Sequence, residues 1–296
     1  MNIPTASYEE IAQEYNAAID WLKAIGIKVN PGRTTNYAKV IDYWKDAYKT
    51  ASEVEAKESL PDFINSVFEI HDFIDIHNAF KNEPNSSLGG LSEKLQKGVN
   101  GPINSADETP KSTSARNFIF EALMAARSHH PTRGVNAILN ADSDTGILID
   151  KKKLWIECKR ILSVSKIEAN IKDASNQLER VLSKKIGTGN RGIVAIDVTK
   201  ILNPNCDLFV QKNDNTLKES IDRLMDQFIS DNSSQWEKVY ARRNKNIIGT
   251  IIRFSFMATS ESRNLPVKAN QWAINPSISA SKTDRYLLKK LVFSIK

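Results

Sequence analysis

The sequence predicts an α/β fold that follows an N-terminal helical module. Three observations predict it: apolar residues recur at helical spacing before residue 82, two short apolar runs flank a polar turn near residue 150, and a helical segment and a buried strand come next. With 296 residues, the chain can bury a substantial core. We expect two domains, an acidic helical module and connector over 1–110 and a basic domain over 111–296.

The first domain is predicted to be helical. Helices are expected over Tyr8–Ile25, over Thr35–Leu60, and from Pro61 to about Lys81, each with an apolar stripe that forms core. The segment Asn82–Ser112 is rich in Gly, Pro, Ser and Asn, which predicts a connector around one short helix. Such a module could bind a protein partner, clamp DNA or mediate self-association.

Charge divides the chain at the same place. Residues 1–110 hold 10 Lys and Arg against 17 Asp and Glu, a net charge of −7, whereas residues 111–296 hold 31 against 18, a net charge of +13. A basic domain is suited to gripping a phosphate backbone. The sequence lacks an apolar run near 18 residues and a signal peptide, and it has only two cysteines. We therefore expect no membrane partner and a reducing cytoplasm.

A helix over Ser112–Arg127 opens the second domain. Most of its residues are apolar, so Glu121 is a lone acid on a helix that is expected to be buried. A buried carboxylate is costly unless it is paired or binds a cation. Glu121 is therefore either an ion-pair partner of Arg116 or Arg127, or a metal ligand.

The segment 144–159 predicts a β-hairpin that carries acids and a lysine on one face. Closing the turn with Asp150 opposite Lys153 pairs Gly146 with Glu157 and Asp144 with Lys159. Because side chains alternate along a strand, Asp144, Glu157 and Lys159 then share a face. Paired carboxylates repel unless a cation or a proton neutralises them. Oxygen ligands suit Mg²⁺ or Mn²⁺.

The order of helical Glu121, Asp144 at a strand start and Glu157-Cys-Lys159 at a strand end resembles the PD-(D/E)xK nuclease superfamily. The resemblance covers about residues 112–198. It implies a restriction-endonuclease-like core, a central mixed sheet flanked by helices in the order αβββαβ. The implied metal ligands are Glu121, Asp144 and Glu157, with Asp142 as a competitor for the role of Asp144.

The same resemblance assigns the remaining core. Lys159 would assist the attacking water, and the expected helix over Ser165–Arg180 would bring Gln177 to the site, with Lys172 and Arg180 as candidate DNA contacts. A buried strand is expected over Gly192–Val198.

Beyond this core the sequence predicts further elements. A helix is expected over Leu217–Trp236, strands over Ile247–Met257 and Asn270–Ile274, and a terminal helix over Lys282–Val292. Before the first of these strands lies a basic cluster, Arg242, Arg243 and Lys245, which either contacts phosphates or forms a solvated loop.

The function expected from these features is Mg²⁺- or Mn²⁺-dependent hydrolysis of DNA by an endonuclease, compatible with restriction or antiviral defence. Two alternatives remain open: a catalytically inactive relative that binds nucleic acid or protein, and a nuclease specific for RNA or for a nucleic-acid structure. Fold alone does not decide among them.

Overall fold

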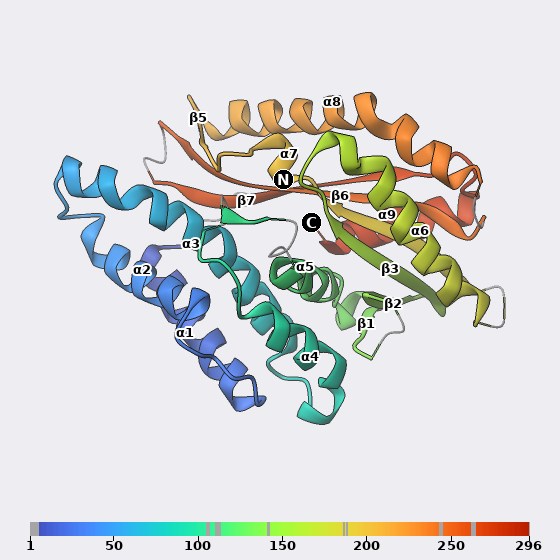
Figure 1. Ribbon diagram of the computed structural model, residues 1–296, viewed down its shortest axis with the longest axis horizontal. Coiled ribbons are helices and arrows are strands. Elements are labelled where there is room, and N and C mark those ends of the chain that lie inside the picture. Colours follow the sequence, from blue (N-terminus) through green and yellow to red (C-terminus); the bar gives the residue numbers. More distant parts are fainter. Residues whose placement is uncertain are drawn as a thin grey trace.

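The structure, a computed structural model, describes residues 6–104, 107–109, 114–140, 143–185, 187, 189–242, 245–261 and 265–295. It has an α/β architecture in which a mixed seven-stranded sheet lies between two layers of helices (Figure 1). This confirms the predicted fold class at the level of a mixed sheet flanked by helices. None of the described helices combines the length and the apolar character needed to cross a membrane.

The strand order in the sheet is β1-β2-β3-β4-β6-β5, with β7 paired to β6. β1, β2 and β3 form an antiparallel meander, β3, β4 and β6 are parallel neighbours, and β7 runs antiparallel along β6. β4 and β5 pair with successive parts of the long strand β6. The strands are β1 (Val135–Ile138), β2 (Thr145–Ile149), β3 (Lys152–Arg160), β4 (Asn190–Asp197), β5 (Leu208–Gln211), β6 (Ile247–Ser260) and β7 (Val267–Pro276).

Two long helices cover one face of the sheet. α6 (Ile167–Ser183) packs on β3 and β4, and α8 (Asp214–Tyr240) packs on β5, β6 and β7. Both lie on the same side in Figure 1, and the short α7 (Thr199–Leu202) follows β4. Their buried side chains form one of the two hydrophobic clusters of the molecule.

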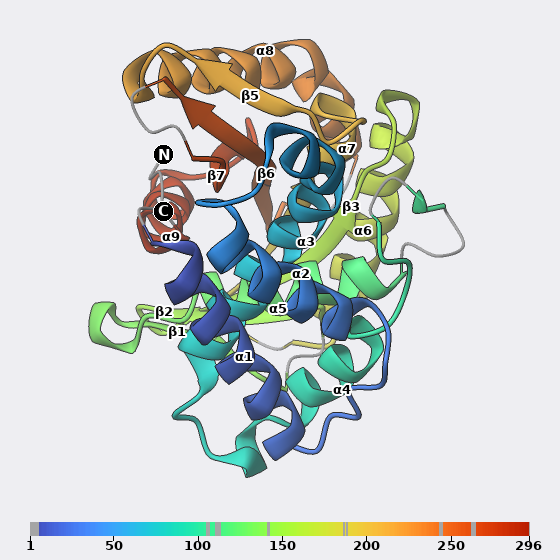
Figure 2. The ribbon, with the colours of Figure 1, turned by 90° about the vertical axis from the view of Figure 1, so that its left-hand side faces the viewer.

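The other face is covered by helices from both ends of the chain. α5 (Ser114–Arg127) contacts β1, β2 and β3, while α3 (Glu53–Phe80) and α9 (Lys282–Ile295) contact β6 and β7. α1 (Tyr8–Ala24) and α2 (Arg33–Ala47) pack on α3, and α4 (Gly89–Gly98) packs on α5. In Figure 2, which shows the left-hand side of Figure 1, α1 and α2 lie nearest the viewer and α8 lies at the top, beyond the sheet.

The N-terminal helices and the sheet share the second hydrophobic cluster, which extends from Tyr8 to Ile295. The predicted domain boundary near residue 110 remains a prediction. Short 3₁₀ turns cover Asn85–Ser87, Pro131–Arg133 and Val164–Lys166.

The predicted boundary between the second and third helices is wrong. α2 ends at Ala47, and α3 begins at Glu53 and runs through Pro61. Ser52 caps α3, because its hydroxyl accepts from the amide of Glu55 while the Glu55 carboxylate accepts from the amide of Ser52. The capping box therefore fixes the start of α3 at Glu53, before the proline that was expected to begin the helix.

The hairpin register also differs from the prediction. Asp150 and Lys151 alone form the turn, with φ of 48° and 64°, and Ile149 pairs with Lys152. Two consecutive left-handed residues are typical of the tight turns that match strand twist. The pairing of Gly146 with Glu157 is therefore wrong, since Gly146 lies opposite Trp155.

Candidate active site

The tighter turn brings the hairpin acids closer than predicted. The last pair of β2 and β3 is Thr145 with Ile156, so the next residues, Asp144 and Glu157, lie beside each other. The register moved by two residues, which leaves every side chain on its predicted face. The Asp144 Oδ2 atom accepts from the amide of Cys158 at 2.8 Å, which fixes the carboxylate at the strand end.

Glu157 is a buried carboxyl group next to Asp144. Only 3% of its surface is exposed. Burial, followed by the charge of Asp144 and a hydrogen bond with it, raises the pKa of Glu157 to about 9. The protonated form of Glu157 is therefore favoured at neutral pH when no cation is bound.

Glu121 reaches the same place from α5. The Thr145 hydroxyl donates to the main-chain oxygen of Glu121 at 2.9 Å, which ties the helix to the start of β2. Burial and the neighbouring Asp144 charge raise the pKa of Glu121 to about 7. The three predicted acids thus gather at the junction of α5, β2 and β3.

Lys94 of α4 is a site residue that the sequence did not reveal. Its ammonium group forms an ion pair with Glu121 and donates to the main-chain oxygen of Asp144. The partner of Glu121 is therefore neither Arg116, which pairs with Glu69, nor Arg127, which pairs with Asp75.

The position of α4 depends on a close backbone approach. The Gly90 amide donates to the Asn140 side chain at 2.9 Å, and a Cβ at Gly90 would stand 2.6 Å from the Leu139 oxygen. Only glycine permits this contact. In the sequence, the signal for such an approach is the pair Gly89-Gly90 within the predicted connector.

Lys159 is held at the site by α6. Its ammonium group donates to Gln177 Oε1 at 2.6 Å and pairs with Asp173 at 3.0 Å. Asp173 and Gln177 lie one turn apart on α6, so one face of the helix positions the lysine.

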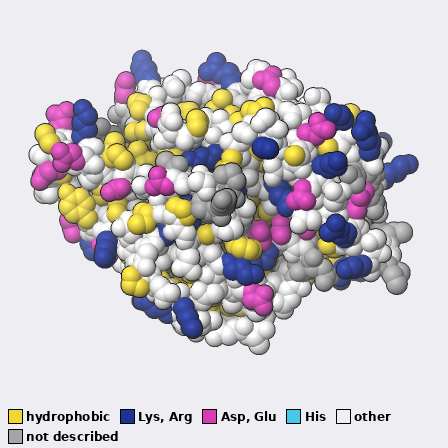
Figure 3. Space-filling view, viewed as in Figure 1, with side chains coloured by type: hydrophobic (Ala, Val, Ile, Leu, Met, Phe, Trp, Pro, Cys, Tyr) yellow, Lys and Arg dark blue, Asp and Glu magenta, His cyan; other side chains and the backbone are white. Residues whose placement is uncertain are grey.

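The three acids, Lys94 and Gln177 border a cleft of about 620 Å³. Its acidic and amide lining residues are Glu93, Glu121, Asp144, Glu157 and Gln177. Its basic lining residues are Lys94, Lys97, Arg180, Lys184 and Lys185. A second hollow, beside Lys151, Lys153 and Asn190, shares Lys184 and Lys185 with it. Lys and Arg side chains gather over this end of the molecule, around α6 and the hairpin (Figure 3).

The other predicted nucleic-acid contacts are dispersed. Lys172 is exposed on α6, and Arg242 and Lys245 are exposed between α8 and β6, outside the lining of both hollows. Arg243 and the competing acid Asp142 lie outside the described residues.

The chemistry of this donor set fits a hard divalent cation. Glu121, Asp144 and Glu157 offer only oxygen ligands, which Mg²⁺ and Mn²⁺ prefer. Within the described part of the chain, no three His, Cys, Asp or Glu side chains stand in a geometry that would hold a metal ion. In this arrangement Lys94 binds a Glu121 oxygen, and burial beside Asp144 raises the pKa of Glu157.

Comparison with protein-family models, with curated proteins and with solved structures finds no match to this chain. The chemistry of the site is therefore inferred from its own residues. They are three acids, a lysine that is hydrogen-bonded to the Gln177 amide, and the basic side chains of the cleft.

Proposed function

We propose that this chain is a metal-dependent nuclease that hydrolyses phosphodiester bonds in DNA, with a PD-(D/E)xK-like core. The observation that carries the proposal is the convergence of Glu121, Asp144 and Glu157 in one cleft with Gln177, which accepts a hydrogen bond from Lys159. The element order α5-β1-β2-β3-α6-β4 supports it, because it agrees with the αβββαβ order that the resemblance implies.

The basic side of the cleft supports a nucleic-acid substrate. Arg180, Lys184 and Lys185 of α6 and the residues that follow it, with Lys97 of α4, surround the acids with positive charge. Phosphate contacts from such side chains position a strand without reading its sequence. The proposed substrate is therefore bound by its backbone.

Each residue has a separate chemical task in the proposed reaction. Glu121, Asp144 and Glu157 would hold the divalent cation, which polarises the scissile phosphate and lowers the pKa of a bound water. Lys159, oriented by Gln177 and Asp173, would align the attacking water and stabilise charge that develops on the phosphate. Lys94 would favour the ionised form of Glu121 before the cation binds, because its charge opposes the rise in pKa that burial and Asp144 cause.

The decisive experiment is incubation with plasmid, linear DNA and RNA in Mg²⁺, Mn²⁺ or EDTA. We expect metal-dependent cleavage by the wild type and losses of at least about 100-fold in Asp144→Asn and Lys159→Ala. Asp150→Asn is the matched control, because Asp150 lies at the far end of the same hairpin and pairs with Lys290.

Three results are informative. Cleavage that needs metal and both residues supports the proposal. Binding without cleavage, unchanged by either substitution, contradicts it in favour of a binding protein. Cleavage of RNA but not DNA supports the proposed metal-dependent hydrolysis and replaces DNA by RNA as the substrate.

A further inference from the structure

A second cavity lies away from the candidate active site. It has a volume of about 50 Å³ and is lined by residues of α3, α5, α7 and β6 and of the carboxyl ends of β3 and β4. It shares no lining residue with the active-site cleft. Part of its wall is apolar, formed by Phe68, Ile119 and Phe120.

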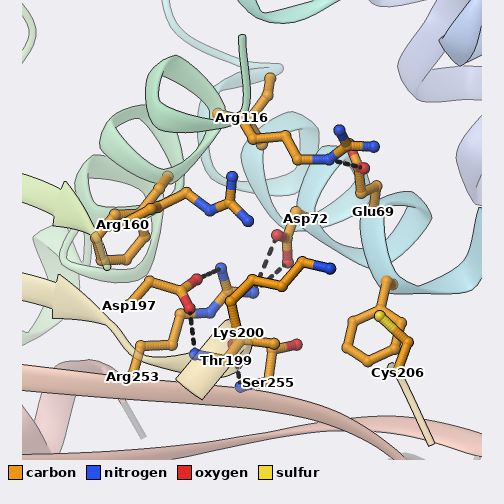
Figure 4. Close-up of a pocket in the computed structure, with 13 residues that line it drawn as sticks. Glu69, Asp72, Arg116, Arg160, Asp197, Thr199, Lys200, Cys206, Arg253 and Ser255 are labelled. Atoms are coloured by element: carbon orange, nitrogen blue, oxygen red, sulfur yellow. Dashed lines mark hydrogen bonds and ion pairs between the residues drawn. The ribbon is translucent and has the colours of Figure 1, made fainter. Parts of the chain in front are cut away.

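Four basic side chains line this cavity: Arg116, Arg160, Lys200 and Arg253. Figure 4 shows Arg160 and Lys200 extending into the middle of the cavity, between Arg116 on α5 and Arg253 on β6. Each comes from a different element, so the fold gathers positive charge that no sequence motif contains.

The carboxylates of the cavity do not balance this charge. Glu69 is shared by Arg116 and by Arg33 behind it. Asp72 is likewise shared, by Arg253 and Lys268.

Two more carboxylates and one ammonium group complete the charges around the cavity. Asp197 accepts from Arg253 at 3.1 Å, and Glu108 pairs with Arg160. The Lys200 ammonium makes a 3.4 Å contact with the main-chain oxygen of Pro204. With Arg33 and Lys268 counted, the described residues named here are six cations against four carboxylates.

Among the described lining residues, two buried donors and one carboxylate oxygen have no hydrogen-bond partner. The donors are Nη1 of Arg116, a residue with 5% of its surface exposed, and the hydroxyl of Ser255, with 3% exposed. The oxygen is Oε2 of Glu69, which lies 3.4 Å from Nη2 of Arg33 in an ion pair. Buried donors are nearly always satisfied in folded proteins, by protein, water or ligand. A guanidinium donor and a hydroxyl without acceptors, beside excess positive charge, call for an oxyanion.

We propose that this cavity binds the phosphoryl group of a phosphate monoester. The guanidinium groups supply planar, charge-assisted donors that match phosphate oxygens. The cavity volume is several times what one water molecule needs, which suits a phosphoryl group. The rest of the phosphate ester would extend out of the cavity past Lys200, which is half-buried. The ligand is either a small phosphate ester or the terminal phosphate of a nucleic-acid strand.

The test is ligand binding by the full chain in EDTA, followed by thermal unfolding at constant ionic strength. The probes are inorganic phosphate, adenosine monophosphate, and a 5′-phosphorylated oligonucleotide with its 5′-hydroxyl counterpart. We expect the melting temperature to rise with phosphate but not with chloride. Lys200→Ala and Arg160→Gln should weaken phosphate binding at least tenfold, while Lys212→Ala, an exposed lysine elsewhere, should not.

The variants separate this site from the proposed nuclease. Asp144→Asn should retain phosphate binding even though it should lose cleavage, so either proposal can fail alone. Equal affinity for inorganic phosphate and adenosine monophosphate identifies a small phosphate compound as the ligand. Tighter binding of the 5′-phosphorylated oligonucleotide than of its 5′-hydroxyl counterpart, lost in Lys200→Ala, identifies the end of a nucleic-acid strand. The inference is overturned if no phosphate raises the melting temperature above the chloride control, or if both cavity variants bind phosphate as the wild type does.

Discussion

Glu157 is the residue whose ionisation most affects the candidate site. Burial and Asp144 raise its pKa to about 9 from an ordinary value of 4.5, against the opposite influence of Lys159. The folded protein therefore binds a proton here that the unfolded chain has lost, over the window between about pH 4.5 and about pH 9. Because the native state binds more protons in that window, its stability falls as the pH rises through it.

Replacing Glu157 by Gln should remove this penalty. In EDTA we expect Glu157→Gln to be more stable than the wild type at pH 8 by up to about 5 kcal/mol, since pH 8 lies about 3.5 units above the ordinary pKa and each unit corresponds to about 1.4 kcal/mol. The difference should vanish near pH 4. Urea unfolding at both pH values measures it, and equal stability at pH 8 would contradict the assigned protonation.

Lys94 links the predicted connector to the acids. Its removal leaves Glu121 buried without its cation, and we expect Lys94→Ala to lower the free energy of unfolding by about 1–3 kcal/mol in EDTA. The loss should shrink in Mg²⁺ if a cation can neutralise Glu121 instead. Lys97→Ala, one turn along α4 and exposed, is the control and should change stability by less than about 0.5 kcal/mol. If Lys94→Ala and Lys97→Ala lower the free energy of unfolding equally, the contact of Lys94 with Glu121 does not stabilise the protein.

The β2–β3 hairpin is the element that organises the site, and its turn carries strain. Lys151 has a φ of 64°, a conformation that costs a residue with a side chain about 1–2 kcal/mol. We expect Lys151→Gly to raise the free energy of unfolding by up to about 1 kcal/mol, as measured by urea unfolding.

A neighbouring position supplies the control for that substitution. Lys152→Gly, in the strand and paired with Ile149, should instead lose about 0.5–1 kcal/mol, because glycine weakens a strand interior. If both glycine variants lose stability equally, the left-handed turn is not formed in solution.

The hairpin also illustrates how much the sequence could predict. Alternation placed Asp144, Glu157 and Lys159 on one face, and this survived the register error because the error was even. The error itself arose because Asp150 and Lys151 adopt left-handed conformations without the usual Asn-Gly signal. The short strands β1 and β5, each of four residues, have no periodic pattern, so no residues were predicted for either strand.

Contacts between residues far apart in the chain could not be predicted from the sequence, for a different reason. Lys94 meets Glu121 across 27 residues, and Arg253 meets Asp72 across 181. Neither pair has a local pattern, since tertiary packing alone brings them together. The helix at Gln177 could be predicted from its amphipathic spacing, whereas its hydrogen bond to Lys159 depends on how α6 crosses β3.

At the scale of the molecule, buried ion pairs connect the N-terminal helices to the sheet. Asp72 of α3 binds Arg253 of β6 and Lys268 of β7, all of them buried. Desolvated charges of this kind are costly to separate. The N-terminal helices are thus bound to the sheet, while Lys and Arg side chains gather at the right-hand end of the molecule in Figure 3.

This separation of charge predicts the salt dependence of nucleic-acid binding, under the proposed function. Lys184 and Lys185 border both hollows, so each is expected to neutralise about one phosphate of a bound strand. For duplex DNA, each such contact contributes about 0.9 to the slope of log affinity against log salt concentration. The Lys184→Ala/Lys185→Ala double variant should therefore lower the magnitude of that slope by nearly 2, measured by fluorescence anisotropy with Ca²⁺ in place of Mg²⁺. Lys39→Ala, exposed on α2 among the acidic helices, should leave the slope unchanged. A slope that falls equally in both variants would mean that the strand follows a different surface from the cleft.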